Sequence, residues 1–577
     1  SAGPGVDLLS SAFHPPPAPL PKGDKKGKTH PFQRPKTMNT NQPVFVHEFL
    51  EHSALRFPDK TALIFQKERI TYREIDKRAN ALARKLIELG IKTGDRVLLL
   101  LENRPEYVIS YYGIMKAGAV AVPVNTDVKP PGLQWLVKDT GAETLVSSSA
   151  FYRVFHDFNF ADAGIKNIII FNPKPGQKDF GVAVTTWEDA ISSPDESSPN
   201  VTVDKDSTAS IIYTSGSTGN PKGVALSHQN IVSNTQAICA SLELTDADIQ
   251  MVVLPFFYVM GKSLLNSHFA LGATVVINNT FLYPATVLKQ MAQEQVTGFS
   301  GVPSTYAFLL HRSPLASYRD QLPHLRYCSQ AGGHMSKAIK VALRNVLPEH
   351  TKIFVMYGAT EASARLTYLD PRFYEAKMDS VGKPVLDTTI QIVDDDGKPV
   401  PAGVDGELVA SGPGIMRGYW NNPEATAEVL DETGYHTGDL GYIDEDGFIY
   451  IKGRKDNQLK VGGNRINTQE IEDLILETGL VVEAFVTGIP DAMLGNKLVA
   501  VVVATNKQTD VQEILSACTR TMPKYKIPQT MLLAPSLPKK ISGKIDKNAC
   551  MELLSKQNSN ESSQYQNNNK GSDHEQH

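Results

Sequence analysis

Apolar runs of strand length alternate with segments of helical spacing along most of this 577-residue chain. Tyr72–Leu89 and Ala285–Gln295 repeat apolar residues at the period of one helix face. Because alternating strands and helices pack as helices over largely parallel sheets, this order predicts the α/β fold class. The strand-like runs include Val97–Leu101, Val120–Val124, Asn167–Phe171, Val252–Leu254 and Ala273–Ile277.

Further along the chain the pattern changes. Ile390–Asp394 and Gly406–Ala410 predict a smaller, antiparallel β region. Phe448–Lys452 follows a turn at Asp444–Gly447, which predicts a hairpin. We expect a boundary near Lys455, so the predicted N-terminal core domain spans 38–455.

A small α+β unit is predicted for residues 456–556. Asn467 followed by Glu470 is the pattern of a capping box, and Val481–Thr487 and Leu498–Ala504 predict strands. Residues 1–37, rich in Pro, Gly and Lys, are expected to be disordered or an artificial leader. The Asn-, Gln- and Ser-rich residues 557–577 are expected to form a disordered tail.

Composition argues against several classes of binding partner and cellular location. The net charge of −4 argues against a general nucleic-acid binder, which would carry a basic face. The four cysteines form no CxxC pair, which favours a reducing, cytoplasmic location over a zinc site or a disulfide framework. The longest apolar stretches, such as Ala117–Val124, and shorter ones such as Val97–Leu101 do not have the length to span a bilayer.

The strongest local signal is a strand that leads into a loop of hydroxyls and glycines. Glycines let backbone N–H groups approach an anion closely, and the lysine adds charge, so this loop suits the β- and γ-phosphates of ATP. The GxxxxGK[ST] spacing of a Walker A loop is absent. A flexible Ser/Gly turn is the alternative. The loop and its flanks contribute Thr214, Ser215, Gly216, Ser217, Thr218, Gly219 and Lys222.

Ordered motifs extend this signal over the chain from about Phe45 to Leu554. They are Thr71–Glu74, Lys116–Ala119, the loop at Thr214–Gly223, Tyr357–Glu361, Tyr435–Asp439, Gly453–Asp456 and Ser542–Lys544. In content and order they resemble the adenylate-forming superfamily of acyl-CoA synthetases, peptide-synthetase adenylation domains and luciferases. The resemblance implies a large N-terminal domain of stacked α/β sheets plus a β subdomain, followed by a small, mobile α+β C-terminal domain.

The resemblance also implies a nucleotide site that binds ATP and Mg²⁺. Tyr357 would stack on adenine, Thr360 would donate to the α-phosphate, and Glu361 would hold Mg²⁺, which commonly takes one carboxylate and keeps several waters. Asp439 and Arg454 would bind the ribose, because a carboxylate can accept from both hydroxyls and a guanidinium is a rigid fork of donors. Gly332, Gly333, Gly358 and Ala359 would complete the site.

Lys544 is the implied catalytic residue of adenylation, and Thr360 assists it. A lysine that bridges the substrate carboxylate and the α-phosphate would stabilise the charge that develops during attack. The small domain would then swing about Asp456 to present a second face. Lys460 would act in thiol transfer, and Gly463 and Arg465 would contact pantetheine. The segment 455–460 also fits an ordinary polar β-edge.

The identity of the carboxylic acid substrate is the feature that the sequence indicates least clearly. Tyr258, Val259, Val302 and Met356 are the implied lining of the acyl pocket, together with neighbouring apolar side chains. Most acyl-CoA synthetases have histidine where this chain has Tyr258. Val259 cannot pair with an ammonium group, which disfavours α-amino acids and favours a fatty or other apolar carboxylate.

The leading hypothesis is therefore an AMP-forming acid–thiol ligase of the acyl-CoA synthetase type, which makes acyl-AMP and passes the acyl group to coenzyme A. The alternative is an acyl-carrier-protein ligase, with phosphopantetheine as acceptor. Because both acceptors end in the same thiol, the sequence hardly separates them. A silent nucleotide-binding scaffold is disfavoured by the presence of Lys544 and Glu361, and nothing demands a luciferase-like oxygenase.

Overall fold

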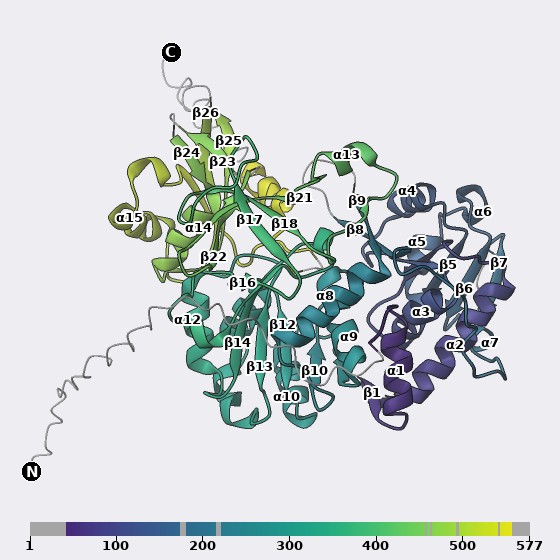
Figure 1. The fold of residues 1–577 in the computed structure, drawn as a ribbon. Helices are drawn as coiled ribbons and strands as arrows, with labels where there is room; N and C mark the ends of the chain where they lie inside the picture. The colour runs from purple at the N-terminus through teal and green to yellow at the C-terminus, as the bar shows by residue number, and fades with distance from the viewer. Residues whose placement is uncertain are drawn as a thin grey trace, which may run out of the picture. The chain divides into compact units, whose positions relative to one another are not determined.

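The computed structural model describes residues 42–173, 180–214, 221–455, 458–461, 464–491, 495–540 and 543–556. Within these residues the chain forms a mixed α/β structure with a large N-terminal and a smaller C-terminal domain (Figure 1). This confirms the predicted fold class. Among the described helices, none combines the length and the apolar character that crossing a bilayer requires.

The first sheet of the N-terminal domain has parallel central strands and antiparallel pairings at both edges. Its order is β16 (Lys383–Pro384), β15 (Thr367–Leu369), β14 (Lys352–Tyr357), β13 (Tyr327–Gln330), β12 (Gly298–Gly301), β10 (Ile249–Val252), β11 (Thr274–Ile277), β1 (Thr61–Phe65) and β2 (Glu68–Thr71). Consequently the loops after β13 and β14 leave the same edge of the sheet.

The second sheet is parallel except at the end that carries the candidate phosphate loop, where β9 pairs antiparallel with both neighbours. Its order is β19 (Gly418–Tyr419), β9 (Lys222–Ser227), β8 (Thr208–Thr214), β4 (Val120–Pro123), β3 (Arg96–Leu100), β5 (Thr144–Ser148), β6 (Asn167–Phe171) and β7 (Ala183–Thr186). Register pairs Thr214 with Lys222, so these two residues hold the ends of the loop.

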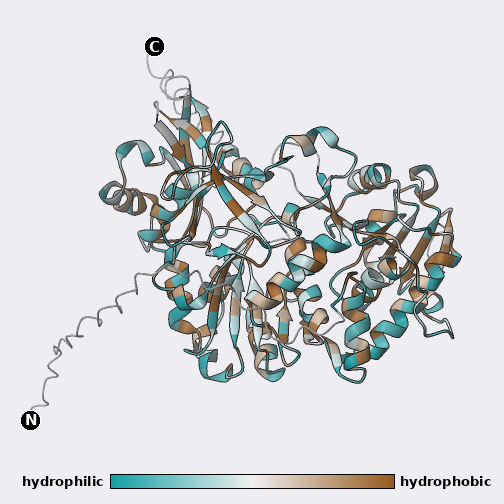
Figure 2. Cartoon of the chain, viewed as in Figure 1, coloured by the Kyte–Doolittle hydropathy of each residue, from teal (hydrophilic) through white to brown (hydrophobic). Residues whose placement is uncertain are grey.

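Helices that are buried on several sides pack against both sheets and form one large apolar core with them (Figures 1 and 2). They are α1 (Glu48–Arg56), α2 (Tyr72–Glu88), α3 (Pro105–Lys116), α8 (His228–Ser241) and α9 (Val259–Leu271). In α3 the fully buried Tyr107, Tyr111 and Tyr112 supply much of this core. Lys116 ends α3 and is buried between Glu51 and Asp76, at 2.6 and 2.8 Å.

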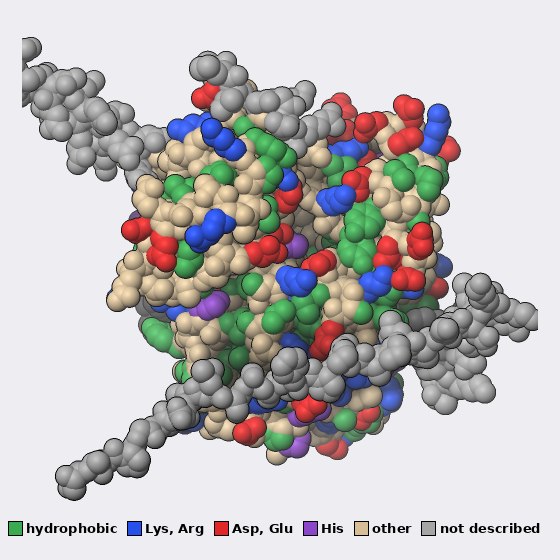
Figure 3. Space-filling view, turned by 90° about the vertical axis from the view of Figure 1, so that its left-hand side faces the viewer, with side chains coloured by type: hydrophobic (Ala, Val, Ile, Leu, Met, Phe, Trp, Pro, Cys, Tyr) green, Lys and Arg blue, Asp and Glu red, His purple; other side chains and the backbone are tan. Residues whose placement is uncertain are grey.

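The remaining helices of this domain cover outer faces or make short connections. The α-helices are α4 (Pro130–Thr140), α5 (Tyr152–Phe155), α6 (Phe160–Ala163), α7 (Trp187–Ala190), α10 (Pro284–Gln293), α11 (Pro303–Arg312), α12 (Lys337–Val346) and α13 (Pro423–Ala427). The 3₁₀ turns are η1 (Ser149–Phe151), η2 (Leu315–Gln321), η3 (Thr360–Ala362) and η4 (Pro371–Phe373). On the face shown in Figure 3, acidic and basic side chains are interspersed.

The third sheet is antiparallel throughout, as the sequence predicted for the β region. It contains β17 (Thr389–Val393), β18 (Gly406–Ser411), β21 (Gly434–Ile443) and β20 (Leu430–Asp431), and β22 (Ile449–Arg454) pairs with β21. The turn between β21 and β22 is built by Asp444, whose carboxylate accepts from the N–H groups of Asp446 and Phe448. This is the predicted hairpin.

The C-terminal domain is a small α+β unit. It contains the ribbon β23 (Gln458–Val461) and β24 (Asn464–Asn467), the sheet β25 (Val481–Asp491), β26 (Gly495–Ala504) and β27 (Thr530–Leu533), the helices α14 (Thr468–Glu477) and α15 (Val511–Thr521), and the turn η6 (Lys524–Lys526). Two buried clusters hold it together, one on each face of β25–β26.

Two local predictions need correction. Asn467 does cap α14, but it accepts from the N–H of Gln469, and the Glu470 carboxylate pairs with Lys526 instead of closing a capping box. The predicted strand Val252–Leu254 begins where β10 ends. Asn103 accepts from the Phe256 N–H at 2.7 Å and donates to the Leu254 carbonyl at 2.8 Å, so a side chain replaces a neighbouring strand there.

Candidate active site

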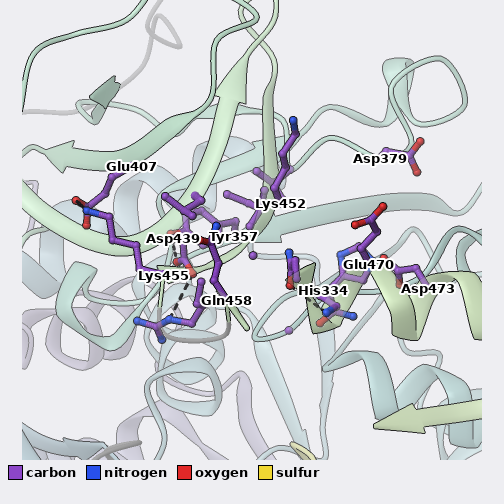
Figure 4. A pocket seen from close by; sticks show the side chains of 18 of the residues that line it. His334, Tyr357, Asp379, Glu407, Asp439, Lys452, Lys455, Gln458, Glu470 and Asp473 are labelled. Atoms are coloured by element: carbon purple, nitrogen blue, oxygen red, sulfur yellow. Dashed lines mark hydrogen bonds and ion pairs between the residues drawn. The ribbon is translucent and has the colours of Figure 1, made fainter. Parts of the chain in front are cut away.

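A cavity of about 1410 Å³ lies where the loops after β13 and β14 meet β21, β22, α14 and the segment 544–547 (Figure 4). The predicted site residues that line it come from distant parts of the chain: Gly332, Gly333, Met356, Tyr357, Gly358, Asp439, Arg454 and Lys544. Tyr357, Gly358, Asp439, Arg454 and Lys544 come from four of the ordered sequence motifs. The fold therefore brings together most of the described residues that the sequence assigned to adenylation.

Tyr357, Asp439 and Arg454 form a connected group on one wall of this cavity. The Tyr357 hydroxyl donates to Asp439 Oδ2 at 2.6 Å, and Arg454 Nε lies 3.6 Å from Asp439 Oδ1. The antiparallel register of β21 and β22 places Asp439 directly opposite Arg454. Tyr357 is the last residue of β14, so the group joins the first and third sheets.

Burial sets the electrostatics of this wall. It raises the pKa of Asp439 above its ordinary value, although the Arg454 charge and the Tyr357 hydrogen bond act in the opposite direction. The pKa of the Tyr357 phenol is raised, mainly by burial and then by the negative charge of Asp439. Tyr357 therefore stays a neutral donor, with its hydroxyl fixed on the carboxylate.

A close backbone approach at Gly358 and a positive φ at Gly332 explain two of the glycines. A Cβ on Gly358 would lie 2.0 Å from the Ala364 carbonyl oxygen, so only glycine fits there. Gly332 has φ +83°, and a Cβ there would lie 3.3 Å from Val302. Gly333 is different, because its nearest neighbours would be side-chain atoms of Pro303 at 3.4 Å, an ordinary contact.

Lys544 enters the cavity from the C-terminal domain. Its Cε lies 3.9 Å from the position of a Cβ on Gly332. The preceding residue, Gly543, accepts a hydrogen bond from the Ser304 hydroxyl, which docks this loop on α11. Burial, then the nearby Arg454 charge, lowers the pKa of Lys544, while the carboxylates of Glu361 and Asp439 oppose the shift. The predicted catalytic lysine thus shares one electrostatic environment with three other predicted site residues.

Glu361 lies in η3 beside a residue that the sequence analysis missed. The Tyr419 hydroxyl donates to Glu361 Oε1 at 2.8 Å, and Lys222 Nζ lies 4.9 Å from the centre of the Tyr419 ring. The pairing of β19 with β9 brings Tyr419 here, and no local sequence signal indicates that pairing. Thr360 and Ala359 are half-buried beside Glu361.

The Glu361 carboxylate is the candidate protein ligand for a metal ion in this part of the site. Within the described residues, no group of three or more His, Cys, Asp or Glu side chains could hold a metal ion. Glu361 fits the mode of Mg²⁺ binding in which one carboxylate is supplemented by water and phosphate oxygens. Ser215, Gly216, Ser217, Thr218 and Gly219 lie outside the described residues, between Thr214 and Lys222.

The predicted acyl-pocket residues divide into two sets. Val302 and Met356 are buried in one cluster with Met260, and Val259 packs against that cluster. Met260 and Val302 also lie next to Gly332, close to Lys544. Tyr258 precedes α9, with its ring centre 4.4 Å from that of Phe257, and it does not belong to the cluster.

The residues predicted for thiol transfer are only partly described. Asp456 and Gly463 lie outside the described residues. Lys460 and Arg465 are opposite each other in the ribbon of β23 and β24. The roles of these four residues in thiol transfer stay predictions.

A second feature missed by the sequence analysis joins the two domains. His334, which follows the Gly332–Gly333 turn, lies 3.0 Å from the Asp473 carboxylate of α14 (Figure 4). A lone histidine and a helical aspartate 139 positions apart in the sequence carry no signal of pairing. Only the docking of α14 near α12 brings them together.

Comparisons with known proteins give a consistent result. Residues 50–420 match the family model described as AMP-binding enzyme, and residues 470–544 match the model described as AMP-binding enzyme C-terminal domain. The chain is 30% identical over 507 residues to the 2-succinylbenzoate–CoA ligase of Bacillus cereus (strain Q1), with 88% of this chain and 98% of the relative covered. It is 31% identical over 533 residues to the long-chain-fatty-acid–CoA ligase of Bacillus subtilis (strain 168), with 88% and 94% covered.

The fold also matches a solved structure with bound ligands. The o-succinylbenzoate coenzyme A synthetase (MenE) from Bacillus subtilis in complex with ATP and magnesium ion gives a TM-score of 0.72 at 26% identity, over 87% of this chain and 98% of that chain. The same protein in complex with the acyl-adenylate intermediate OSB-AMP gives a TM-score of 0.73 at 27% identity, over 87% and 97%.

Proposed function

The chain belongs to the family of AMP-binding enzymes and is an acid–thiol ligase, and we propose that it uses ATP and Mg²⁺ to convert an apolar carboxylic acid into acyl-AMP and then into an acyl-thioester of coenzyme A. The observation that carries the proposal is the position of Lys544. It enters from the C-terminal domain beside Gly332 and shares a cavity with Tyr357, Asp439 and Arg454. That arrangement suits the first half-reaction.

In adenylation, a carboxylate oxygen of the acid attacks the α-phosphorus of ATP and pyrophosphate leaves with its bonding electrons. Tyr357 would face adenine, and Asp439 with Arg454 would hold the ribose. Lys544 would lie between the acid and the α-phosphate, and Thr360 would donate to that phosphate. A fixed positive charge stabilises the developing negative charge without reorganising during the step. Burial also strengthens this effect, because water no longer screens the charges.

Glu361 would hold Mg²⁺, whose charge supports the leaving pyrophosphate. Tyr419 donates to one oxygen of Glu361 and so fixes the orientation of the carboxylate. The β8–β9 pairing presents Thr214 and Lys222 at the ends of the segment 215–220, which would bind the β- and γ-phosphates. The solved relative with ATP and magnesium ion supports this choice of ligands.

The second half-reaction needs a thiol where Lys544 now lies. A thiolate sulfur attacks the acyl carbon of acyl-AMP, the carbonyl–phosphate bond breaks, and AMP leaves. We propose that the domain of residues 456–556 turns about Asp456 relative to residues 38–455, so that Lys460 acts in the transfer and Gly463 and Arg465 contact pantetheine. Proline at 456 would fix φ and should impair one half-reaction selectively.

An acid with a largely apolar body fits the pocket best. Val302, Met260 and Met356 form the apolar surface next to Lys544, and Val259 offers no partner to an ammonium group. A fatty acid is the class that we favour, and a long-chain-fatty-acid–CoA ligase among the relatives supports it. Coenzyme A is the proposed acceptor, because both curated relatives are named as CoA ligases.

The test is ATP–pyrophosphate exchange with a panel of carboxylates, followed by thioester formation. Exchange with apolar acids and with none of the α-amino acids is the expected result. If no carboxylate in the panel supports exchange, the proposed activity is wrong. Offering coenzyme A or a holo acyl carrier protein to the same adenylate separates the two acceptors, and transfer to the carrier protein alone would favour the alternative ligase.

A further inference from the structure

Arg365 is a buried cation that the mechanism above does not use. The residue is 3% exposed, and the one hydrogen bond that its side chain makes among the described residues runs from NH1 to the adjacent Ala364 carbonyl at 3.2 Å. The buried Nε has no hydrogen-bond partner there. Within the described part of the chain no carboxylate forms an ion pair with it, and burial alone lowers its pKa to about 10, so it remains charged at neutral pH.

Two other buried cations in the same chain have partners. Lys116 lies between the carboxylates of Glu51 and Asp76. Lys340 donates to the Met378 carbonyl at 2.6 Å, with the charges of Asp379 and Asp473 nearby. A buried charge without a partner is strongly unfavourable, and nothing among the described residues compensates that cost at Arg365.

The backbone at this position is held in place, so the unpartnered guanidinium does not result from a loose segment. Asn234 of α8 accepts from the Arg365 N–H at 3.1 Å and donates to its carbonyl at 2.7 Å. Ser363 and Ala364, just before it, have φ of +57° and +142°. Such strained residues persist where the surroundings hold them, and they are frequent at binding sites.

Arg365 is also next to the cavity. Its Cα would lie 2.7 Å from a Cβ placed on Gly358, which lines the cavity between Tyr357 and Thr360. Ala364, which precedes Arg365, is buried in the same large apolar core of the N-terminal domain as Met260, Val302 and Met356. Arg365 NH1 donates to the Ala364 carbonyl, whose oxygen would lie 2.0 Å from that same Cβ, so the guanidinium lies directly behind Gly358 although Arg365 does not itself line the cavity.

We propose that Arg365 binds a second carboxylate of the acid, so that the substrate is a dicarboxylic acid whose two carboxylates are separated by an apolar body. The guanidinium matches a carboxylate as a two-pronged donor, and it would disfavour the matched monocarboxylate, which leaves the charge of Arg365 unpaired. This inference rests on the proposed adenylation activity and replaces the fatty monocarboxylate favoured above with a diacid that has an apolar body.

The experiment compares pyrophosphate exchange for straight-chain monocarboxylic acids and the dicarboxylic acids of the same carbon number, with 2-succinylbenzoate as an aromatic dicarboxylate. We expect kcat/KM for at least one dicarboxylate to exceed that of its matched monocarboxylate by about tenfold or more. In Arg365→Met this preference should vanish while exchange with monocarboxylates persists, and Arg365→Lys should keep part of it. Monocarboxylates preferred throughout would overturn the inference but leave the adenylation activity intact.

Stability separates a binding role from a structural one. Arg365→Met should unfold at the same temperature as the parent protein, or higher, when no ligand is present, because it removes an unpaired buried charge. Lys116→Met, which breaks a paired cation, should unfold at a lower temperature. If Arg365→Met loses as much stability as Lys116→Met, the guanidinium is structural and the inference fails.

Kinetics supply a second control. If Arg365→Met raises only the KM for ATP, the guanidinium binds a phosphate of ATP, and the inference is also overturned. Should Arg365→Met not fold, Arg365→Lys carries the selectivity test.

Discussion

The role of Lys544 depends on where the fold places its side chain. It is one of several lysines near the C-terminus of the chain, yet it alone among Lys539, Lys540, Lys544 and Lys547 lies against Gly332. Burial and the Arg454 charge lower its pKa, and two carboxylates partly restore it. A lysine held in this way can act as a fixed charge at the reacting phosphate.

We predict that Lys544→Ala loses adenylation while still binding ATP. Removal of one preorganised donor from a transition state costs about 3–4 kcal/mol, a rate loss of about a hundred- to a thousandfold. Pyrophosphate exchange measures the loss, and fluorescent-ATP titration measures binding. Lys540→Ala is the matched control and should keep most of the exchange rate. Equal rates for Lys544→Ala and the parent protein would remove Lys544 from its role.

The burial of two histidines, His228 and His268, leads to a prediction of how the stability of the protein depends on pH. Burial, and then the neighbouring His47, lowers the pKa of His228 to about 3, and burial lowers the pKa of His268 to about 4. Below about pH 6.5 the unfolded chain binds protons that the folded chain does not, so stability present above that pH is lost as the pH falls toward 3.

For each of these histidines the free energy of unfolding should decrease by up to about 1.4 kcal/mol per pH unit between pH 6 and 4. Urea unfolding at several pH values measures the slope. His228→Asn should flatten it, whereas the same change at the exposed His156 should not. An unchanged slope in His228→Asn would show that this residue titrates alike in both states.

At the scale of elements, the crossing between β14 and the segment before β15 decides the shape of the site. Gly358 lies so close to the Ala364 carbonyl that the two segments touch backbone to backbone. The register of β14 and β15 continues this contact, with Tyr357 opposite Thr367. The glycine of the Tyr-Gly-Ala-Thr-Glu motif is therefore needed for packing as much as for access to nucleotide.

Gly358→Ala should disrupt the site, because its Cβ would lie 2.0 Å from a backbone oxygen that cannot move independently. We expect a loss of stability of about 1–3 kcal/mol and a larger loss of exchange activity. Gly333→Ala provides the control in the same cavity, since its Cβ would meet only Pro303 side-chain atoms at 3.4 Å. Thermal unfolding and exchange rates of the two variants should differ; similar values would contradict the steric argument.

For the whole molecule, the central question is how the two domains share one reaction. His334 pairs with Asp473, Ser304 donates to Gly543, and Arg312 NH2 donates to the Pro535 carbonyl at 3.4 Å. All three contacts join the N-terminal domain to the C-terminal domain while Lys544 is in the cavity. They would stabilise the adenylation arrangement relative to the one proposed for thiol transfer.

His334→Ala and Asp473→Asn should therefore slow pyrophosphate exchange more than thioester formation from supplied acyl-adenylate. The pair is partly exposed, so its contribution is at most about 1 kcal/mol and each effect should be under about tenfold. In a double-mutant cycle the two changes should be non-additive. Lys352→Ala, which breaks a pair with Glu243 inside the N-terminal domain, should leave the ratio of the two rates unchanged. A ratio that moves equally in all variants would contradict this role.

The sequence by itself determined the fold class, the antiparallel β region and the family. These depend on local signals, namely the period of apolar residues, turn residues such as Asp444, and motifs a few residues long. It did not determine the end of β10, the pairing of Tyr419 with Glu361, the contact of His334 with Asp473, or the lack of an ion-pair partner for Arg365 in the described part of the chain. Each of these depends on residues far apart in the chain, such as Asn103 acting on Phe256. Tertiary structure decided them, because only a folded chain determines which polar groups lose water and which partners replace it.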